Sequence, residues 1–224
     1  MIFSVNHETR YERTSPFKQS VQQLHLTPRT YKGQKIINWK IELEGAKKIL
    51  DTIDHHGNCV QITEQTERSE EIIITACGQV ETENMLGVFG SHDNLLPIAL
   101  YRRVTNYCEV GPTLKRMISC VELKSDKLEF LHYLSSYVAK SVVYKIGTTD
   151  AATTAEESAS LGTGVCQDHV HIFLTLARHF DIAARYVSGY LMTSESDANM
   201  VSHAWAEAHV EGLGWVGFDI SNGV

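Results

Sequence analysis

One cysteine stands where a glycine-rich turn meets the start of a predicted helix. The stretch Gly162-Thr163-Gly164-Val165 precedes Cys166, and apolar residues then recur at helical spacing from Val170 to Ala177. Cys166 therefore falls in the first turn of the helix, where unpaired backbone N–H groups and the helix dipole favour a thiolate. A lone cysteine in an apolar helix is more often a buried structural residue. Its position directly after Gly-x-Gly is what favours a nucleophile that attacks a carbonyl carbon.

A histidine and an aspartate further along the chain could complete a Cys-His-Asp triad. Val201–Val210 alternates in character, which predicts a strand with His203 on one face. Trp215–Ile220 is predicted to return antiparallel to it, with Asp219 on one of its faces. In a triad, His203 would take the proton of Cys166, and Asp219 would fix the tautomer of the imidazole. A register slip of one residue would separate the two side chains, and each has a structural alternative: a core histidine, and an aspartate that begins a turn.

The elements that must position these residues form two predicted domains of an α+β protein. Residues 1–83 follow a period of two and predict an antiparallel β domain with a structural or substrate-positioning role. Residues 84–125 are divided by glycines and prolines, and we interpret them as a connector. The predicted strands of the first domain are Ile2–Tyr11, Val21–Leu26, Lys35–Leu43, Asn58–Thr63 and Glu71–Val80.

Residues 126–224 form the second predicted domain, in which helices pack on an antiparallel sheet. Leucines recur there at helical spacing before the pattern returns to strands around His203. The first predicted helix is capped by Ser125 or Asp126 and ends near Val142. A short helix follows, which begins with a capping box at Thr153 or Thr154 and ends at Gly162. The Cys166 helix then runs to about Phe180, and after it come a strand at Ile182–Leu191 and a polar loop at Ser194–Asn199.

Composition and charge limit the classes of function. The net charge is −7 and no block of like charges occurs, which argues against binding to nucleic acid or to an anionic membrane. We therefore expect a protein, peptide or small-molecule substrate. Residues 1–8 lack the pattern of a secretory signal, and no apolar run approaches the roughly 18 residues of a membrane span. The five cysteines form no CxxC pair and are expected to be reduced, which together predicts a cytoplasmic protein.

Four separated motifs carry a resemblance to a known family. They are Gly-Val-Cys-Gln-Asp at 164–168, Ala-Arg-Tyr-Val-Ser-Gly-Tyr at 184–190, Ser-His-Ala-Trp-Ala-Glu at 202–207 and Gly-Trp-Val-Gly-Phe-Asp at 214–219. In order and spacing they resemble the core of the bacterial transglutaminase-like superfamily, whose members are often labelled cysteine proteases. The motifs Leu-His-Leu-Thr-Pro-Arg at 24–29 and Asp-His-His-Gly-Asn at 54–58 resemble the β-rich region that precedes this core.

The resemblance implies a papain-like α+β core with a defined set of roles. Cys166 would be the nucleophile, His203 the base and then the acid, and Asp219 the residue that orients the imidazole. Members of the family usually carry an apolar residue at the position of His169 and a histidine at that of His171. Relatives also continue with further strands after the aspartate, whereas this chain ends five residues after Asp219, so a shortened C-terminus is one interpretation.

An amidase of this kind needs donors for the oxyanion of its tetrahedral intermediate. The backbone N–H of Cys166 is the expected first donor because it lies at a helix N-terminus. Tyr144 is our candidate for the second, with core packing as the alternative. Asp168 could instead serve the dipole of its own helix. Further candidates for oxyanion or substrate contact are Gln167, Tyr190 and Trp205; for the two aromatic residues, packing in the core is the default interpretation.

Two other classes of function compete with a thiol-dependent amide hydrolase. A metal site could be built from His169, His171 and His203, but two helical residues two apart point about 200° from each other, so we expect no metal and no other cofactor. A non-catalytic binding module on the same fold is the second alternative. Within the enzyme class, the thioester on Cys166 could pass to water or to an amine, as in a transglutaminase. We favour water because no EF-hand-like calcium loop is visible in the sequence.

Overall fold

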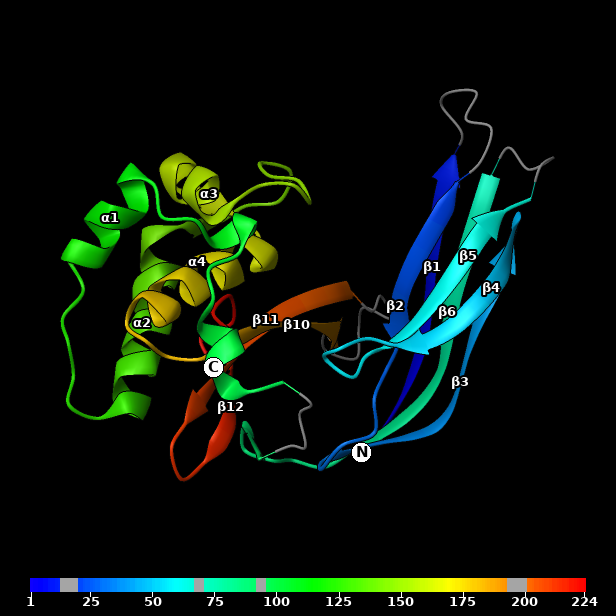
Figure 1. Ribbon diagram of the computed structural model, residues 1–224, viewed down its shortest axis with the longest axis horizontal. Coiled ribbons are helices and arrows are strands. Elements are labelled where there is room, and N and C mark those ends of the chain that lie inside the picture. Colours follow the sequence, from blue (N-terminus) through cyan, green and yellow to red (C-terminus); the bar gives the residue numbers. More distant parts are fainter. Residues whose placement is uncertain (13–19, 67–70, 92–95, 193–200) are drawn as a thin grey trace. The chain divides into compact units, whose positions relative to one another are not determined.

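The computed structural model describes residues 1–12, 20–66, 71–91, 96–192 and 201–224. The chain divides into two compact units. Met1–Met85 belongs to the first, and Leu86–His92 with Pro97–Val224 forms the second. Both units appear in Figure 1.

The first unit consists of two three-stranded antiparallel sheets. One has the strand order β1-β6-β3 and the other β2-β5-β4. Ile72 and Ile74 of one sheet and Leu24 of the other form a common buried cluster, and Trp39 Nε1 donates to the carbonyl of Leu26 at 3.1 Å. Alternating apolar residues thus face a shared interior, as the period of two predicts. The strands are β1 (Ile2–Glu12), β2 (Val21–Thr27), β3 (Gln34–Glu44), β4 (Ala46–Ile53), β5 (Cys59–Gln65) and β6 (Glu71–Thr82).

Strand β4 is the element of this unit that the sequence does not predict. Its segment, Ala-Lys-Lys-Ile-Leu-Asp-Thr-Ile, shows no alternation, and seven of its eight residues are exposed. Backbone pairing with β5 holds it at the edge of its sheet, with an irregularity between Lys48 and Leu50. Hydrophobic patterning therefore could not reveal it, because almost none of its side chains enter the core.

The second unit packs helices against a four-stranded antiparallel sheet of order β10-β11-β12-β7. The central contact is between the last long helix, α4, and β11, whose residues Ala204, Ala206 and Ala208 are buried. Small side chains at these positions let the helix approach the strand closely. The sheet contains β7 (Val88–Gly90), β10 (Ala184–Leu191), β11 (Val201–Val210) and β12 (Gly214–Phe218), and the helices are α1 (Pro112–Ser119), α2 (Lys127–Ser141), α3 (Ala155–Leu161) and α4 (Cys166–His179).

Local sequence signals account for the helix boundaries. Asp126 caps α2 by accepting a hydrogen bond from the N–H of Glu129 at 2.7 Å. Thr154 and Glu157 form the capping box of α3, and Gly162 ends that helix in the left-handed conformation at φ 66°. Of the two residues that the sequence offered for each cap, the structure therefore uses Asp126 for α2 and Thr154 for α3. The mixed α+β class is the one that the sequence predicts.

Residues 84–125, which we interpreted as a connector, contain regular structure of the second unit. β7 pairs with β12 and completes the sheet. Two short 3₁₀ helices, η1 (Ile98–Arg102) and η2 (Asn106–Cys108), precede α1. Glu156 of α3 accepts hydrogen bonds from the N–H groups of Thr113 and Leu114 at 2.7 and 3.0 Å, so a distant carboxylate caps α1. A capping group this far away in sequence leaves no local signal.

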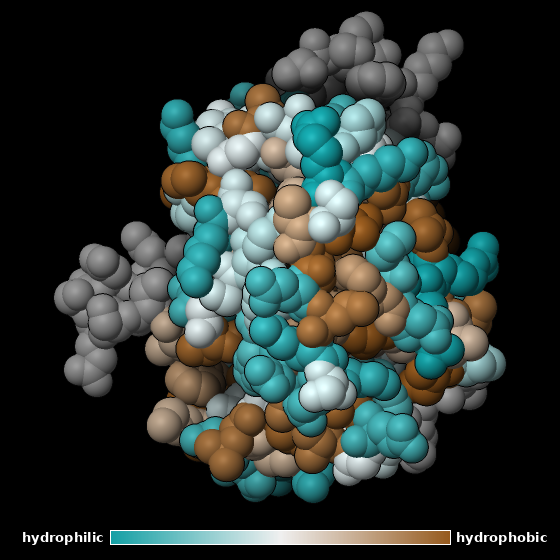
Figure 2. Space-filling model, turned by 90° about the vertical axis from the view of Figure 1, so that its left-hand side faces the viewer, coloured by the Kyte–Doolittle hydropathy of each residue, from teal (hydrophilic) through white to brown (hydrophobic). Residues whose placement is uncertain are grey.

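The segments before and after α3 pair as a short two-stranded parallel ladder. β8 (Val143–Tyr144) pairs with β9 (Thr163–Gly164), which immediately precedes α4. The predicted loop Ser194–Asn199 lies outside the described residues. Across the described parts of the chain, no helix combines the length and apolar character that a membrane crossing requires. On the face shown in Figure 2, small groups of apolar residues alternate with hydrophilic ones.

Candidate active site

Cys166 is the first residue of α4, and a buried carboxylate shapes the turn that presents it. Asp168 is fully buried, and its Oδ2 accepts from the N–H of Val165 and from Thr149 Oγ1, both at 2.7 Å. Gly164 makes this approach possible, because a Cβ there would lie only 2.7 Å from the Cβ of Asp168. Asp168 thus serves the start of its own helix, in line with the local role considered for it. Cys166 itself is half-buried.

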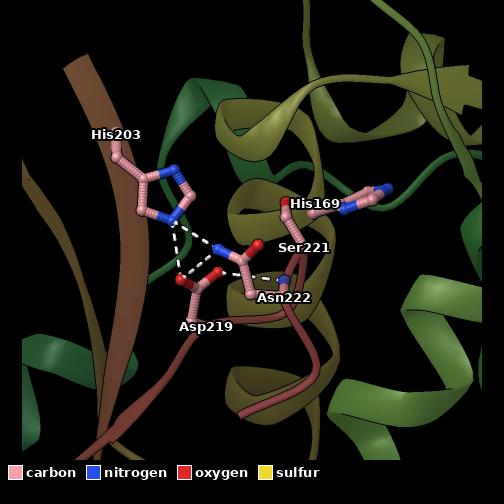
Figure 3. Close-up of polar contacts among 5 residues, drawn as sticks. All are labelled: His169, His203, Asp219, Ser221 and Asn222. Atoms are coloured by element: carbon pink, nitrogen blue, oxygen red, sulfur yellow. Dashed lines mark hydrogen bonds and ion pairs between the residues drawn. The ribbon is translucent and has the colours of Figure 1, made fainter. Parts of the chain in front are cut away.

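His203 and Asp219 meet through a short hydrogen bond. The His203 Nε2 atom lies 2.7 Å from Asp219 Oδ2, and the two side chains are only 9% and 16% exposed. Register explains the pairing: Glu207 lies opposite Gly217 in the β11–β12 ladder, so every second residue of both strands shares that face. Asp219 follows directly after β12, within diagonal reach of His203. The hydrogen bond that the hairpin predicts is therefore present in the structure (Figure 3).

Asn222 completes this arrangement and was not identified from the sequence. Its Nδ2 donates to Asp219 Oδ2 at 2.7 Å, and its backbone N–H donates to Oδ1 at 3.3 Å. The N–H of Gly223 also donates to the carbonyl of Asp219 at 2.9 Å. Asp219 thus begins a turn and holds His203 at once, so the two interpretations of this residue are compatible. The sequence signal for Asn222 was its position three residues after Asp219 within a turn-forming stretch.

The first turn of α4 touches the turn that begins at Asp219. His169, only 2% exposed, lies 3.0 Å from Ser221 Oγ through Nδ1 and 2.9 Å from the carbonyl of Val142 through Nε2. The helix that starts with Cys166 is therefore joined to the segment that carries Asp219 (Figure 3). Within the described residues no hydrogen bond joins Cys166 to His203. Geometry that tightens only when substrate binds is common among catalytic groups.

Two tyrosines flank the nucleophile candidate. Burial raises the pKa of Tyr144, and electrostatic interactions with Cys166 and Asp219 raise it further. Burial likewise raises the pKa of Tyr186 to about 12, with electrostatic interactions with Cys166 and Asp168 acting in the same direction. Both phenols therefore keep their protons at neutral pH and can donate hydrogen bonds. Tyr186 lies in the Ala-Arg-Tyr-Val-Ser-Gly-Tyr motif but was not singled out from the sequence.

The remaining residues that we predicted to contact substrate or the oxyanion are Gln167, Trp205 and Tyr190. Gln167 donates from Nε2 to the carbonyl of Asp150 at 3.3 Å, so its amide supports the loop before α3. Trp205 stacks near His203, with ring centroids 6.4 Å apart, and covers Gly189, where a Cβ would lie 2.6 Å from the indole. Burial raises the pKa of Tyr190. Trp205 is thus the member of this group that lies beside the His203 ring.

The three histidines of the metal alternative lie in different environments. His171 stacks between Tyr107 and Tyr186, at ring-centroid distances of 5.0 and 5.2 Å, whereas His169 bonds Ser221. His203 instead bonds Asp219. Over the part of the chain that the structure describes, no group of three or more His, Cys, Asp or Glu side chains could hold a metal ion. The described side chains of this region instead include a half-buried cysteine, Cys166, and a hydrogen-bonded histidine–carboxylate pair.

Two family models match the chain. Residues 116–220 match the transglutaminase-like superfamily, and residues 3–81 match the bacterial transglutaminase-like N-terminal region. The chain belongs to the transglutaminase-like superfamily. The superfamily match spans Cys166, His203 and Asp219 within one core, and it identifies a family of thiol-dependent enzymes.

Individual relatives extend over nearly the whole chain. An uncharacterized protein of Mycobacterium leprae is 26% identical over 98% of this chain and 83% of its own length. An uncharacterized protein of Mycobacterium tuberculosis is 26% identical over 98% of this chain and 78% of its own. Among solved structures, one described as a "Putative Cysteine Protease" from Cytophaga hutchinsonii superimposes with a TM-score of 0.75, 18% identity and coverage of 100% of this chain and 80% of that one. The last comparison shows the fold.

Proposed function

We propose that this protein is a thiol-dependent amide hydrolase that acts on a protein or peptide substrate. The observation that carries the proposal is the 2.7 Å hydrogen bond between His203 Nε2 and Asp219 Oδ2. Because Nε2 donates to the carboxylate, the lone pair of the neutral ring resides on Nδ1. Nδ1 is then the atom that can take a proton from Cys166, and Asp219 fixes this tautomer.

The proposed reaction proceeds through a thioester. His203 Nδ1 accepts the thiol proton, and the Cys166 sulfur forms a bond to the amide carbonyl carbon. The resulting oxyanion receives hydrogen bonds from the backbone N–H of Cys166 and from a second donor, for which Tyr144 is the candidate. The imidazolium returns its proton to the leaving nitrogen as the C–N bond breaks, which leaves an acyl group on sulfur.

The second half of the reaction releases the acyl group. Water loses a proton to His203 Nδ1 and attacks the thioester, and the protonated ring then returns that proton to the Cys166 sulfur as the acid departs. An amine could enter in the same way, which would make the protein an acyl transferase. Release of ammonia from a glutamine side chain followed by attack of water would make it a deamidase.

Product analysis separates these outcomes and tests the proposal. Purified protein is incubated with a peptide library, with and without a primary amine, and the products are identified by mass spectrometry. The proposal predicts cleaved or hydrolysed amides in the wild type and none with Cys166→Ala. Amine adducts would favour transfer, and loss of ammonia would favour deamidation. Unchanged peptides in all samples would favour a non-catalytic binding module.

The alanine variant needs a control for folding. Cys120→Ala replaces an exposed cysteine outside the site and should retain activity, since this thiol is not part of the proposed mechanism. Equal activity of Cys166→Ala and the wild type would remove Cys166 from the mechanism. Matching circular dichroism spectra of the two variants would show that the comparison is between folded proteins.

A further inference from the structure

A buried histidine outside the proposed triad connects three segments of the second unit. The ring of His169 lies 2.9 Å from the carbonyl of Val142 through Nε2 and 3.0 Å from Ser221 Oγ through Nδ1. Val142 follows α2, His169 lies in the first turn of α4, and Ser221 lies in the turn after β12. One side chain thus links the ends of elements that are far apart in sequence, and Figure 3 shows His169 beside Ser221.

The partners of His169 define its tautomer. A carbonyl oxygen can only accept, so Nε2 must carry the proton that it donates to Val142. In the neutral ring Nδ1 is then an acceptor, and the hydroxyl of Ser221 is the donor. Burial lowers the pKa of His169, which keeps the ring in this neutral form near pH 7. Both ring nitrogens therefore have a defined role and direction.

The Ser221 contact fixes a segment whose orientation matters for Asp219. Ile220, 1% exposed, packs into the core and sets the depth of the turn. Apolar packing is not directional, whereas a hydrogen bond at the next residue constrains how the turn is rotated. Asn222 then holds both oxygens of the Asp219 carboxylate. The residue that His169 contacts, Ser221, therefore lies in sequence between the buried Ile220 and Asn222, which bonds the Asp219 carboxylate.

His169 also lies close to Cys166 along α4. His169 follows Cys166 by three residues, and residues three apart lie on neighbouring parts of a helix surface. We propose that His169 is a positioning residue that keeps the Asp219 turn aligned with the start of α4, so that Asp219 presents His203 to Cys166. This inference rests on the proposed function, since it concerns the same three groups.

A purely space-filling role would not require these contacts. An apolar ring could fill a buried site without hydrogen-bonding partners, whereas each buried imidazole nitrogen that lacks a partner costs free energy. His169 has both, and they lie on segments outside its own helix. The polar link is thus suited to setting the relative positions of those segments.

Substitutions at Ser221 test the link with little change in volume. Ser221→Ala removes the hydroxyl donor, and Ser221→Thr retains it. We expect Ser221→Ala to lower kcat by about 10- to 100-fold with little change in KM, because a displacement of about 1 Å can cost about 10²-fold in rate. Ser221→Thr should recover most of that loss. Ser119→Ala is the matched control, since it likewise removes a hydroxyl that donates a hydrogen bond, in this case to the carbonyl of Arg116 at 2.7 Å, but at an exposed position on α1.

Substitution of His169 tests the same contact with Ser221 from the other side. His169→Phe fills the site but breaks both bonds, and it should lower kcat as much as Ser221→Ala. In the double variant the two effects should not add, because both substitutions remove the same link. Additive losses, or an unchanged kcat in Ser221→Ala, would overturn the inference. Loss of activity in Ser221→Thr equal to that in Ser221→Ala would do the same.

A spectroscopic readout keeps the inference testable apart from catalysis. The proton on His203 Nε2 should exchange slowly with water in the wild type and be visible by ¹⁵N-resolved NMR. Ser221→Ala should speed its exchange, while Ser119→Ala should not. If the wild type cleaves no amide but this difference appears, the proposed function fails and the positioning role stands. If amides are cleaved but the proton is unaffected by Ser221→Ala, the positioning role fails alone.

Discussion

Acid should destabilise the second unit through one partly buried histidine, His171. Its ring stacks between Tyr107 and Tyr186, and its Nδ1 is buried without a hydrogen-bond partner among the described residues. Burial lowers the pKa of His171 to about 4; Asp168 opposes this effect and Arg178 adds to it. In the unfolded chain the ordinary value near 6.5 applies.

The direction and size of the effect follow from these two values. Well above pH 6.5 the ring is neutral in both states and contributes no pH dependence. As pH falls from 6.5 towards 4, the unfolded chain binds a proton that the folded protein does not, so stability is lost in that window. The gap between 6.5 and about 4 corresponds to about 3 kcal/mol at about 1.4 kcal/mol per pH unit, reached near pH 4.

Urea unfolding at pH 7 and pH 4.5, followed by circular dichroism, measures this loss. The variant His171→Phe keeps an aromatic ring in the stack and removes the titrating group. Other groups titrate equally in both proteins, so the wild type should lose about 2 to 3 kcal/mol more than the variant between the two pH values. His171→Gln provides a second non-titrating variant should Phe impair folding.

A control on the same helix separates this effect from the general loss of a histidine. His179 is exposed near the end of α4, and His179→Phe should leave the acid sensitivity at the wild-type level. Equal losses of stability in the wild type, His171→Phe and His171→Gln would refute the reasoning. So would a larger loss in either variant than in the wild type.

Three further predictions concern the site. Iodoacetamide should label Cys166 faster than the exposed Cys120 near neutral pH, because helix N–H groups stabilise negative charge on its sulfur; equal rates by peptide mass spectrometry would count against a nucleophile. Asp219→Asn should lower kcat by about 10²–10⁴-fold in steady-state assays while the fold is retained, and full activity would exclude the orienting role. Gly164→Ala should destabilise the protein by about 1–3 kcal/mol in urea unfolding, because its Cβ would displace Asp168 from the helix start; unchanged stability would show that the site can relax at no cost.

Patterns confined to a few neighbouring residues were sufficient to predict the local features of the fold. The capping box at Thr154 and the cap at Asp126 follow from residue types at fixed spacing, and both are present. The start of α4 at Cys166 was predicted in the same way. Strand β4 was missed because its side chains are exposed and carry no periodic signal. The predictable part of the fold is thus the part whose signals are local or whose side chains alternate between core and solvent.

The site combines local signals with contacts that no local pattern contains. Alternation placed His203 on one face of its strand, but only the observed register brings it to Asp219. The contact between His169 and Ser221 joins residues 52 apart, and neither residue type by itself indicates it. Asn222 was visible as part of a turn, although its bond to the carboxylate depends on the three-dimensional path of that turn.

The central claim is that Cys166, activated by His203, forms an acyl thioester. Intact-protein and peptide mass spectrometry after rapid acid quenching, with a peptide amide identified as a substrate, tests this most directly. We expect one acyl group per chain, located on Cys166, and a strongly reduced adduct in His203→Ala. An acyl group on another residue, or an undiminished adduct in Cys166→Ala, would contradict it.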